Sequence, residues 1–115
     1  MNANMGINEY LTTHATWLNP GAGIEFKLRT PPLVCADGFT LSVQASRLHY
    51  SKPATDLGPY THVEVAYPSG PAPELETYRN GGIYGFVPVA LVDAVLAQHG
   101  GIAVPNWPVR SEVDA

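Results

Sequence analysis

Alternation of apolar and polar side chains, the period of a strand with one buried face, marks several short segments of the chain. It is strict over residues 24–29 and clearest over residues 39–46, where Thr, Ser and Gln separate the apolar positions. A weaker alternation covers residues 62–67, and short apolar runs occupy residues 33–36 and 83–87. Prolines, glycines and an Asp-Gly step fall between these segments and favour tight turns there. The pattern predicts short strands joined by frequent turns.

Residues 88–99 have helical periodicity instead. Pro88 suits the first helical position because its missing N–H needs no partner there, and Gly100-Gly101 supplies a C-terminal stop. The apolar positions that recur on one face are Val89, Val92, Val95 and Leu96. We expect a helix of about three turns, followed by a returning strand over residues 102–104.

Residues 7–18 have a mixed pattern. One set of side chains follows helical spacing: Ile7, Tyr10, Leu11 and His14. Another set has the higher strand propensity: Thr12, Thr13, Thr16 and Trp17. We favour a strand with irregular ends, followed by a turn over residues 19–23, while a helix remains the alternative.

These elements predict the α+β class, with a small, mostly antiparallel sheet packed against one C-terminal helix. The length of 115 residues corresponds to one domain. We expect a disordered N-terminus over residues 1–6, a single α+β domain over residues 7–104 and a C-terminal tail over residues 105–115.

Composition and charge narrow the classes of function. Apolar residues make up 45% of the chain and charged residues 14%, which fits a folded core and not a disordered chain. The net charge is −4, and the six basic residues are scattered, so we expect no direct nucleic-acid binding. The chain has no apolar run long enough for a membrane span and no secretory signal at residues 1–6, which favours a cytoplasmic protein.

Candidate catalytic and metal-binding patterns are weak. The four histidines form neither HxH nor HExxH spacing; they are His14, His49, His62 and His99. His62 and Glu64 share one strand face, but a metal would need further ligands from elsewhere. Cys35, the one cysteine, lies in an apolar strand and is expected to pack there. We therefore expect no metal, no cofactor and no enzymatic activity.

A row of neutral polar side chains follows the outer face of the 39–46 strand. The row consists of Ser42, Gln44 and Ser46, and Arg47, His49 and Tyr50 continue it into the next loop. The simplest interpretation is the solvated side of an antiparallel sheet. The functional interpretation is a recognition surface, because Tyr and Arg are enriched at interfaces and neutral polar groups lose water more cheaply than charges. We predict that these six residues contact a partner protein.

Several short runs carry a resemblance: VCADGF (34–39), SVQAS (42–46), HY (49–50), VEV (63–65), PS (68–69), YG (84–85), VPV (87–89) and HGG (99–101). Together they resemble a family of short, uncharacterised accessory proteins encoded by bacteriophages and prophages. The resemblance covers roughly residues 31–102. It implies no catalytic residues, because no activity is established for that family.

The resemblance implies a phage protein in the host cytoplasm that blocks a host or antiviral-defence protein by direct contact, as an anti-CRISPR inhibitor does. One alternative is a small structural or assembly protein of the virion, which would form a homo-oligomer through an exposed strand edge. Another is a small-ligand-binding protein or enzyme that uses His49 and His62.

Overall fold

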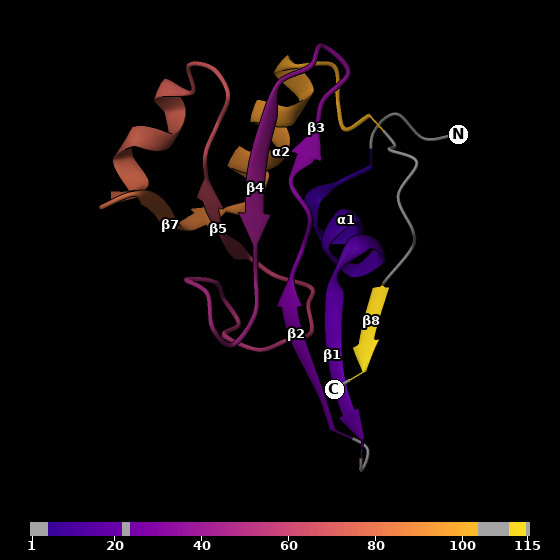
Figure 1. Ribbon diagram of the computed structural model, residues 1–115. Coiled ribbons are helices and arrows are strands. Elements are labelled where there is room, and N and C mark those ends of the chain that lie inside the picture. The colour runs from indigo at the N-terminus through magenta and orange to yellow at the C-terminus, as the bar shows by residue number, and fades with distance from the viewer. Residues whose placement is uncertain (1–4, 22–23, 104–110, 115) are drawn as a thin grey trace.

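Residues 5–21, 24–103 and 111–114 are described by the computed structural model of the chain (Figure 1). They form two α-helices, α1 (Ile7–His14) and α2 (Val89–Gln98), one 3-10 helix, η1 (Pro73–Tyr78), and eight strands. The strands are β1 (Thr16–Gly21), β2 (Ile24–Arg29), β3 (Leu33–Val34), β4 (Thr40–Gln44), β5 (His62–Ala66), β6 (Arg79–Asn80), β7 (Ile83–Pro88) and β8 (Ser111–Asp114).

The strands form two sheets. The larger sheet has the order β3-β4-β5-β7-β6 and is antiparallel throughout, and the smaller has the order β2-β1-β8. In the smaller sheet, β1 pairs antiparallel with β2 and parallel with β8. Figure 1 shows β1 and β2 projecting beyond the larger sheet, with α2 beside the larger sheet. The predicted α+β class, a mostly antiparallel sheet with a C-terminal helix, is confirmed.

The predicted hairpin between β3 and β4 is also confirmed. Its turn is closed by two backbone hydrogen bonds, from Cys35 N–H to Phe39 C=O at 2.8 Å and from Gly38 N–H to Cys35 C=O at 2.9 Å. Gly38 has a φ of +95°, which glycine adopts without the steric penalty of a Cβ. The Asp-Gly step therefore ends one strand and starts the next in register.

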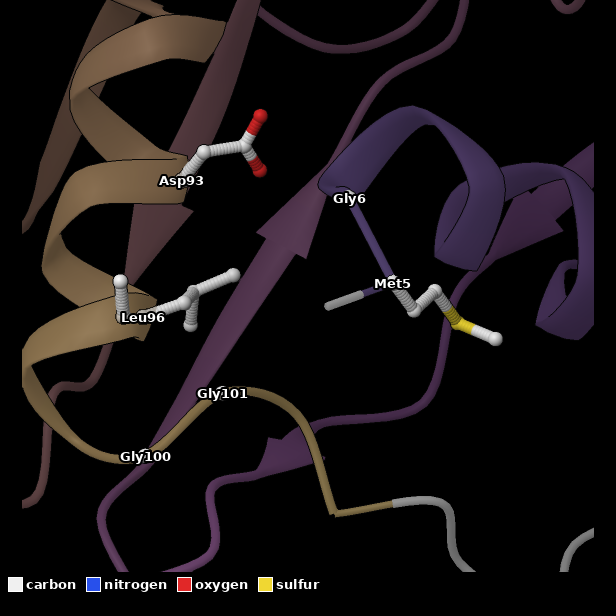
Figure 2. Close-up of a pocket in the computed structure, with 7 residues that line it drawn as sticks. Met5, Gly6, Asp93, Leu96, Gly100 and Gly101 are labelled. Atoms are coloured by element: carbon white, nitrogen blue, oxygen red, sulfur yellow. The ribbon is translucent and has the colours of Figure 1, made fainter. Parts of the chain in front are cut away.

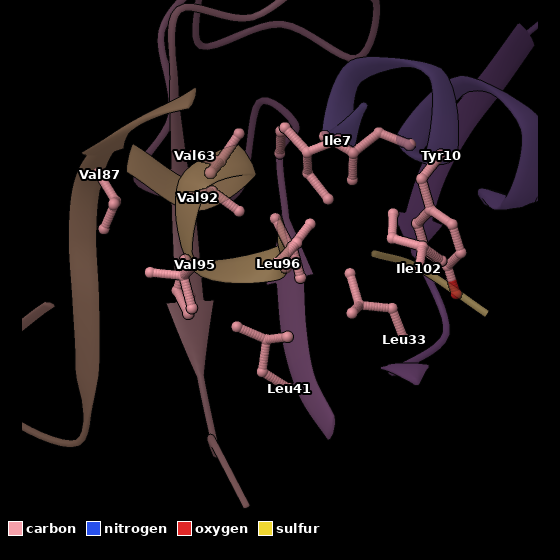
Figure 3. Packing of buried hydrophobic residues seen from close by; sticks show 14 of the residues in the cluster. Ile7, Tyr10, Leu33, Leu41, Val63, Val87, Val92, Val95, Leu96 and Ile102 are labelled. Carbon is pink, nitrogen blue, oxygen red and sulfur yellow. The ribbon is translucent and has the colours of Figure 1, made fainter. Parts of the chain in front are cut away.

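Helix α2 covers the sheet with the face that its spacing predicts. Val92, Val95 and Leu96 are buried and pack with side chains from the strands, including Leu41 and Val63 (Figure 3). Pro88 lies just before the helix, as its N-cap residue. The glycine pair after the helix has φ values of +87° and +85°, so the predicted stop is confirmed.

Residues 7–14 form a helix, so the strand favoured for this segment is wrong there and holds only from Thr16 onward. The helix is stabilised by tertiary packing, because its helically spaced set is buried in the core; this set is Ile7, Tyr10, Leu11 and His14. Asp93 on α2 accepts a hydrogen bond from Ile7 N–H at 2.9 Å. Packing and this contact outweigh the low helix propensity of the threonines.

The predictions for the two ends fall mostly outside the described residues. Of residues 1–6, the structure describes only Met5 and Gly6, and Met5 packs against the core. Residues 111–114 of the predicted tail form β8 beside β1. In the 19–23 segment, β1 continues through Gly21, and residues 22–23 lie outside the described part.

Candidate functional site

The polar row on β4 is covered by other parts of the chain. Ser42, Gln44 and Ser46 are 8%, 7% and 0% exposed. Leu41, Val43 and Ala45 on the opposite side of the strand are also buried. The expectation that the row faces solvent or a partner is therefore wrong. The period of two separates the faces correctly, but it does not say whether the second face is wet.

The Gln44 side chain is fully engaged within the protein. Its Oε1 accepts from Thr30 N–H at 2.7 Å, and its Nε2 donates to Thr30 C=O at 2.7 Å and to Ser42 Oγ at 3.0 Å. The amide thus bonds both backbone groups of Thr30, as a neighbouring strand would. Gln44 fastens the segment between β2 and β3 onto the outer face of β4.

Ser46 and His49 shape the loop that follows β4. Ser46 Oγ accepts from Leu48 N–H at 3.0 Å and lies 2.6 Å from His49 Nδ1. Ser51 Oγ donates to Ser46 C=O at 3.1 Å. Burial lowers the pKa of His49, against the opposing charge of Glu64. These contacts hold the turn in one conformation and leave Ser46 no exposed surface.

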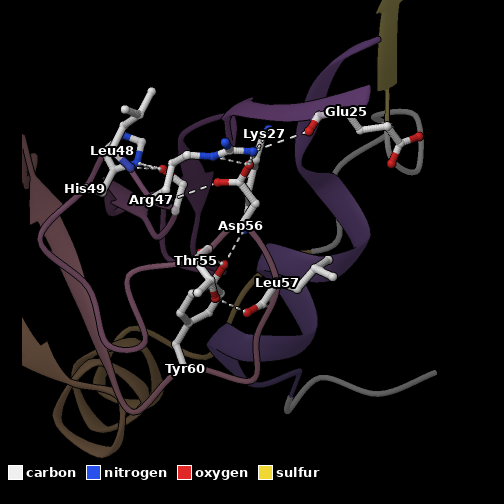
Figure 4. A network of polar contacts seen from close by, with 10 residues as sticks. Glu25, Lys27, Arg47, Leu48, His49, Thr55, Asp56, Leu57 and Tyr60 are labelled. Atoms are coloured by element: carbon white, nitrogen blue, oxygen red, sulfur yellow. Dashed lines mark hydrogen bonds and ion pairs between the residues drawn. The ribbon is translucent and has the colours of Figure 1, made fainter. Parts of the chain in front are cut away.

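Arg47 and Asp56 form an ion pair against the edge of β2 (Figure 4). Asp56 accepts from Arg47 Nη2 at 2.7 Å and Nε at 3.0 Å, and also from Lys27 N–H at 3.1 Å. Arg47 Nη2 donates to Glu25 C=O at 3.4 Å. Burial acts to raise the pKa of Asp56, but the hydrogen bonds from Arg47 and Lys27 outweigh it and hold that pKa below its usual value. The pair occupies backbone groups on an edge strand that would otherwise invite another strand.

Tyr50 and Phe86 form an exposed aromatic pair. Their ring centroids lie 5.5 Å apart at an interplanar angle of 52°, and the residues are 48% and 41% exposed. Phe86 N–H donates to Tyr50 C=O at 3.2 Å, and Glu64 Oε1 accepts from Tyr50 N–H at 3.0 Å. The backbones of both aromatic residues are therefore fixed by hydrogen bonds, while their rings remain accessible.

A bulge in β7 places Phe86 in this position. Val87 pairs with Val63, but Tyr84 pairs with Val65, so β7 carries an extra residue between these pairs. Phe86 has a φ of +51°, in the left-handed region that bulky side chains rarely adopt. Bulges of this kind turn a side chain away from its strand alternation. The result is that the Phe86 ring lies at the surface, while the other residues of β7 are buried or half-buried.

Lys52 lies beside the pair, with its Nζ 5.6 Å from the Phe86 ring centroid. Its backbone is bonded to the start of β5, with Lys52 N–H donating to His62 C=O at 3.0 Å. We call Tyr50, Lys52 and Phe86 the Tyr50–Phe86 patch. Of the six predicted contact residues, only Tyr50 belongs to it; Arg47 and His49 stabilise the loop that carries it. Sequence reasoning missed Phe86, although Gly85, a glycine inside a strand, is a signal for a bulge.

Two further histidines, His62 and His99, contact other side chains of the protein. His62 Nδ1 lies 2.8 Å from Thr61 Oγ1, and His99 Nδ1 lies 2.7 Å from Asp37 Oδ2. Burial raises the pKa of the Cys35 thiol to about 11, so this thiol stays protonated near neutral pH. Over residues 5–21, 24–103 and 111–114, no three His, Cys, Asp or Glu side chains are grouped to hold a metal ion.

Described residues also line hollows in the surface of the protein. One, of about 460 Å³, lies between the start of α1 and the end of α2, with Asp93 and Leu96 on one side and Met5 and Gly6 on the other (Figure 2). The Asp93 carboxylate within it binds the N-terminus of α1. A smaller one, of about 70 Å³, is lined by Trp17 of β1, Lys27 of β2, the end of α1 and residues 56–58.

Comparison of the chain with known families, curated proteins and solved structures identified no related protein. No protein-family model matches the chain, and no curated protein or solved structure shows significant similarity to it. The resemblance to phage-encoded accessory proteins stays a prediction. Within the part of the chain that the structure describes, no helix is both long and apolar enough to cross a membrane.

Proposed function

We propose that this protein is a non-enzymatic binding module that contacts a partner protein through the Tyr50–Phe86 patch. The observation that carries the proposal is the left-handed conformation of Phe86, which holds an exposed aromatic ring beside Tyr50. A left-handed conformation at a bulky residue is unfavourable by about 1–3 kcal/mol and persists where surrounding structure enforces it. Burial of an apolar ring would offset that strain, and a partner surface supplies such burial.

The composition of the patch fits a protein contact. Aromatic side chains dominate binding energy at interfaces because they present a large, rigid apolar area. Lys52 adds a positive charge, and among the described residues no carboxylate lies within ion-pair distance of it. A suitable partner segment would pack an apolar side chain against the two rings and pair a carboxylate with the Lys52 ammonium group.

The proposed partner is a bacterial host or antiviral-defence protein. This choice rests on the resemblance to phage and prophage accessory proteins, and the exposed patch supports it by providing a surface for blocking contacts. Virion assembly and ligand binding through His49 and His62 remain the competing hypotheses. Hydrogen bonds of His49 to Ser46 and of His62 to Thr61 weigh against a shared ligand site.

Affinity capture from bacterial lysate tests the proposal. Proteins retained by the wild type would be compared with those retained by the Tyr50→Ala/Phe86→Ala double variant, using quantitative mass spectrometry. Tyr67→Ala is the matched control, because Tyr67 is exposed, also has a positive φ, and lies at the opposite end of β5. We expect a specific partner to be lost from the double variant and kept by Tyr67→Ala. Equal capture by a folded double variant would refute the assignment.

A further inference from the structure

Lys27 is buried although its strand alternation predicts an exposed charged face. The residue is 4% exposed, while Phe26 and Leu28 on the other face of β2 are the exposed ones. Register explains the inversion, because Lys27 pairs with Trp17, and both point to the side that the body of the protein covers. A buried ammonium group is unfavourable unless it is well paired.

The Lys27 amine has few partners. Its Nζ donates to the Tyr60 hydroxyl at 3.2 Å and lies 4.9 Å from the Tyr60 ring centroid. The Asp56 carboxylate attracts the amine, but this carboxylate accepts its hydrogen bonds from Arg47 and from the backbone N–H of Lys27. Burial lowers the pKa of Lys27 to about 8, with Asp56 opposing that shift. At pH 7 about a tenth of the amine is therefore neutral and nucleophilic, against less than about a thousandth for an ordinary lysine.

A small cavity that Lys27 lines offers space for a ligand beside this side chain. The cavity of about 70 Å³ is lined by Lys27, Trp17, Asp56 and Leu57, among others. Since about 10–15 Å³ of such space holds one water molecule, the cavity takes a ligand of about five heavy atoms or fewer. Leu57 is largely exposed, so the cavity lies next to solvent. The lining is mainly apolar and contains a carboxylate, which disfavours an anionic ligand.

We propose that Lys27 is a Schiff-base site for small, neutral aliphatic aldehydes. The neutral Nζ forms a bond to the carbonyl carbon, the C=O π pair moves to oxygen, and a proton passes from nitrogen to that oxygen. The carbinolamine then loses water: its C–O bond breaks as the nitrogen lone pair forms C=N. The Tyr60 hydroxyl accepts from Nζ at 3.2 Å and donates its own proton to Thr55 C=O at 2.8 Å, so it orients the amine, and water from the adjacent solvent protonates the departing hydroxyl. Burial raises the pKa of Tyr60 to about 12, so this hydroxyl stays protonated and keeps its bond to Thr55.

Reductive trapping tests the site on the intact protein. Acetaldehyde and cyanoborohydride at pH 7 convert a Schiff base to an ethyl-lysine, because the hydride adds to the protonated imine carbon. The chain has two lysines, so the exposed Lys52 is an internal control in the same sample. Peptide mapping by mass spectrometry then gives both labelling rates. We expect Lys27 to react at least about tenfold faster than Lys52, since a lowered pKa raises the neutral fraction.

Two further experiments show whether fast labelling of Lys27 depends on the folded cavity or only on the intrinsic reactivity of a lysine. In concentrated urea, both lysines should react at similar rates, because unfolding removes the environment of Lys27. With benzaldehyde, which is too large for the cavity, the native protein should react faster at Lys52, and Leu57→Ala should restore labelling at Lys27. A native protein in which acetaldehyde labels Lys52 as fast as Lys27 would overturn the proposal. So would a preference for Lys27 that persists in urea.

Discussion

The side-chain amide of Gln44 bonds both the N–H and the C=O of Thr30, each at 2.7 Å. Asn8 makes the same paired contact with Tyr60, accepting from its N–H at 2.7 Å and donating to its C=O at 2.9 Å. Each amide takes the place of a strand at a point where the backbone has no strand neighbour. This protein therefore uses polar side chains inside the fold to join segments that are separate in the sequence.

Replacement of Gln44 by leucine should strongly destabilise the protein. The leucine side chain would fill a similar volume but leave the N–H and C=O of Thr30 unsatisfied in a buried environment, at about 1–3 kcal/mol for each group. We expect the free energy of unfolding in urea to fall by about 2–4 kcal/mol. Gln98→Leu, at an exposed position on α2, is the control and should change it by less than about 0.5 kcal/mol. A similar small loss in both variants would show that the Thr30 contact contributes little.

Replacement of Lys27 by methionine should stabilise the protein near neutral pH. The pKa of Lys27 is about 8 in the folded state against 10.5 ordinarily, so the unfolded chain binds more protons between these values. The unfolding free energy of the wild type therefore increases as the pH rises from about 8 towards 10.5. Below pH 8 the folded protein must bury the charged amine, which is unfavourable. We expect Lys27→Met to exceed the wild type by about 1–3 kcal/mol at pH 7.

That advantage should shrink as pH rises from 8 towards 10. Urea unfolding of both proteins over this pH range gives the difference between their unfolding free energies. Groups that titrate equally in both proteins do not contribute to this difference. The raised pKa of Tyr60 makes the wild type lose stability above pH 10, so the comparison ends there. Lys52→Met, at an exposed lysine, is the control and should change the unfolding free energy at pH 7 by less than about 0.5 kcal/mol. A Lys27→Met variant that is less stable at pH 7 would mean that the bond to Tyr60 outweighs desolvation.

Phe86→Gly should separate stability from binding. Glycine adopts a φ of +51° without the steric penalty that Phe86 bears, which is about 1–2 kcal/mol for left-handed residues. Loss of the ring contact with Tyr50 offsets part of this gain, so we expect thermal stability to stay level or rise slightly. Capture of the partner should be lost. Tyr67→Gly, with a wild-type φ of +55°, should keep the capture. Normal capture of the partner by Phe86→Gly would contradict the proposal that the Phe86 ring contacts the partner.

Local signals in the sequence predicted much of the fold. The Asp37-Gly38 turn, the alternation in β4 and β5, and the apolar face and glycine stop of α2 all act within a few residues of one another. Such signals depend on backbone geometry and on the burial of one face. They are therefore visible in one sequence without knowledge of the tertiary contacts.

The candidate site was harder to predict because it depends on contacts between distant residues. Ser42 and Gln44 look like solvated residues until Thr30, 14 residues before Gln44, is brought beside them. Lys27 is buried because of its register with Trp17, and alternation alone cannot assign the buried face of a strand with charges on one side. Helix α1 likewise forms because α2 packs against it. Only the glycine at position 85 signalled the bulge that exposes Phe86.

Site-specific photocrosslinking tests the central claim most directly. The photoreactive residue p-benzoylphenylalanine would replace Tyr50 in one protein and Tyr67 in another, both exposed aromatic positions. After irradiation in bacterial cells, we expect a discrete covalent complex with a bacterial protein from position 50, lost when Phe86→Gly is added, and none from position 67. Crosslinks to the same protein from both positions, or from position 67 alone, would contradict a binding surface built on Tyr50 and Phe86.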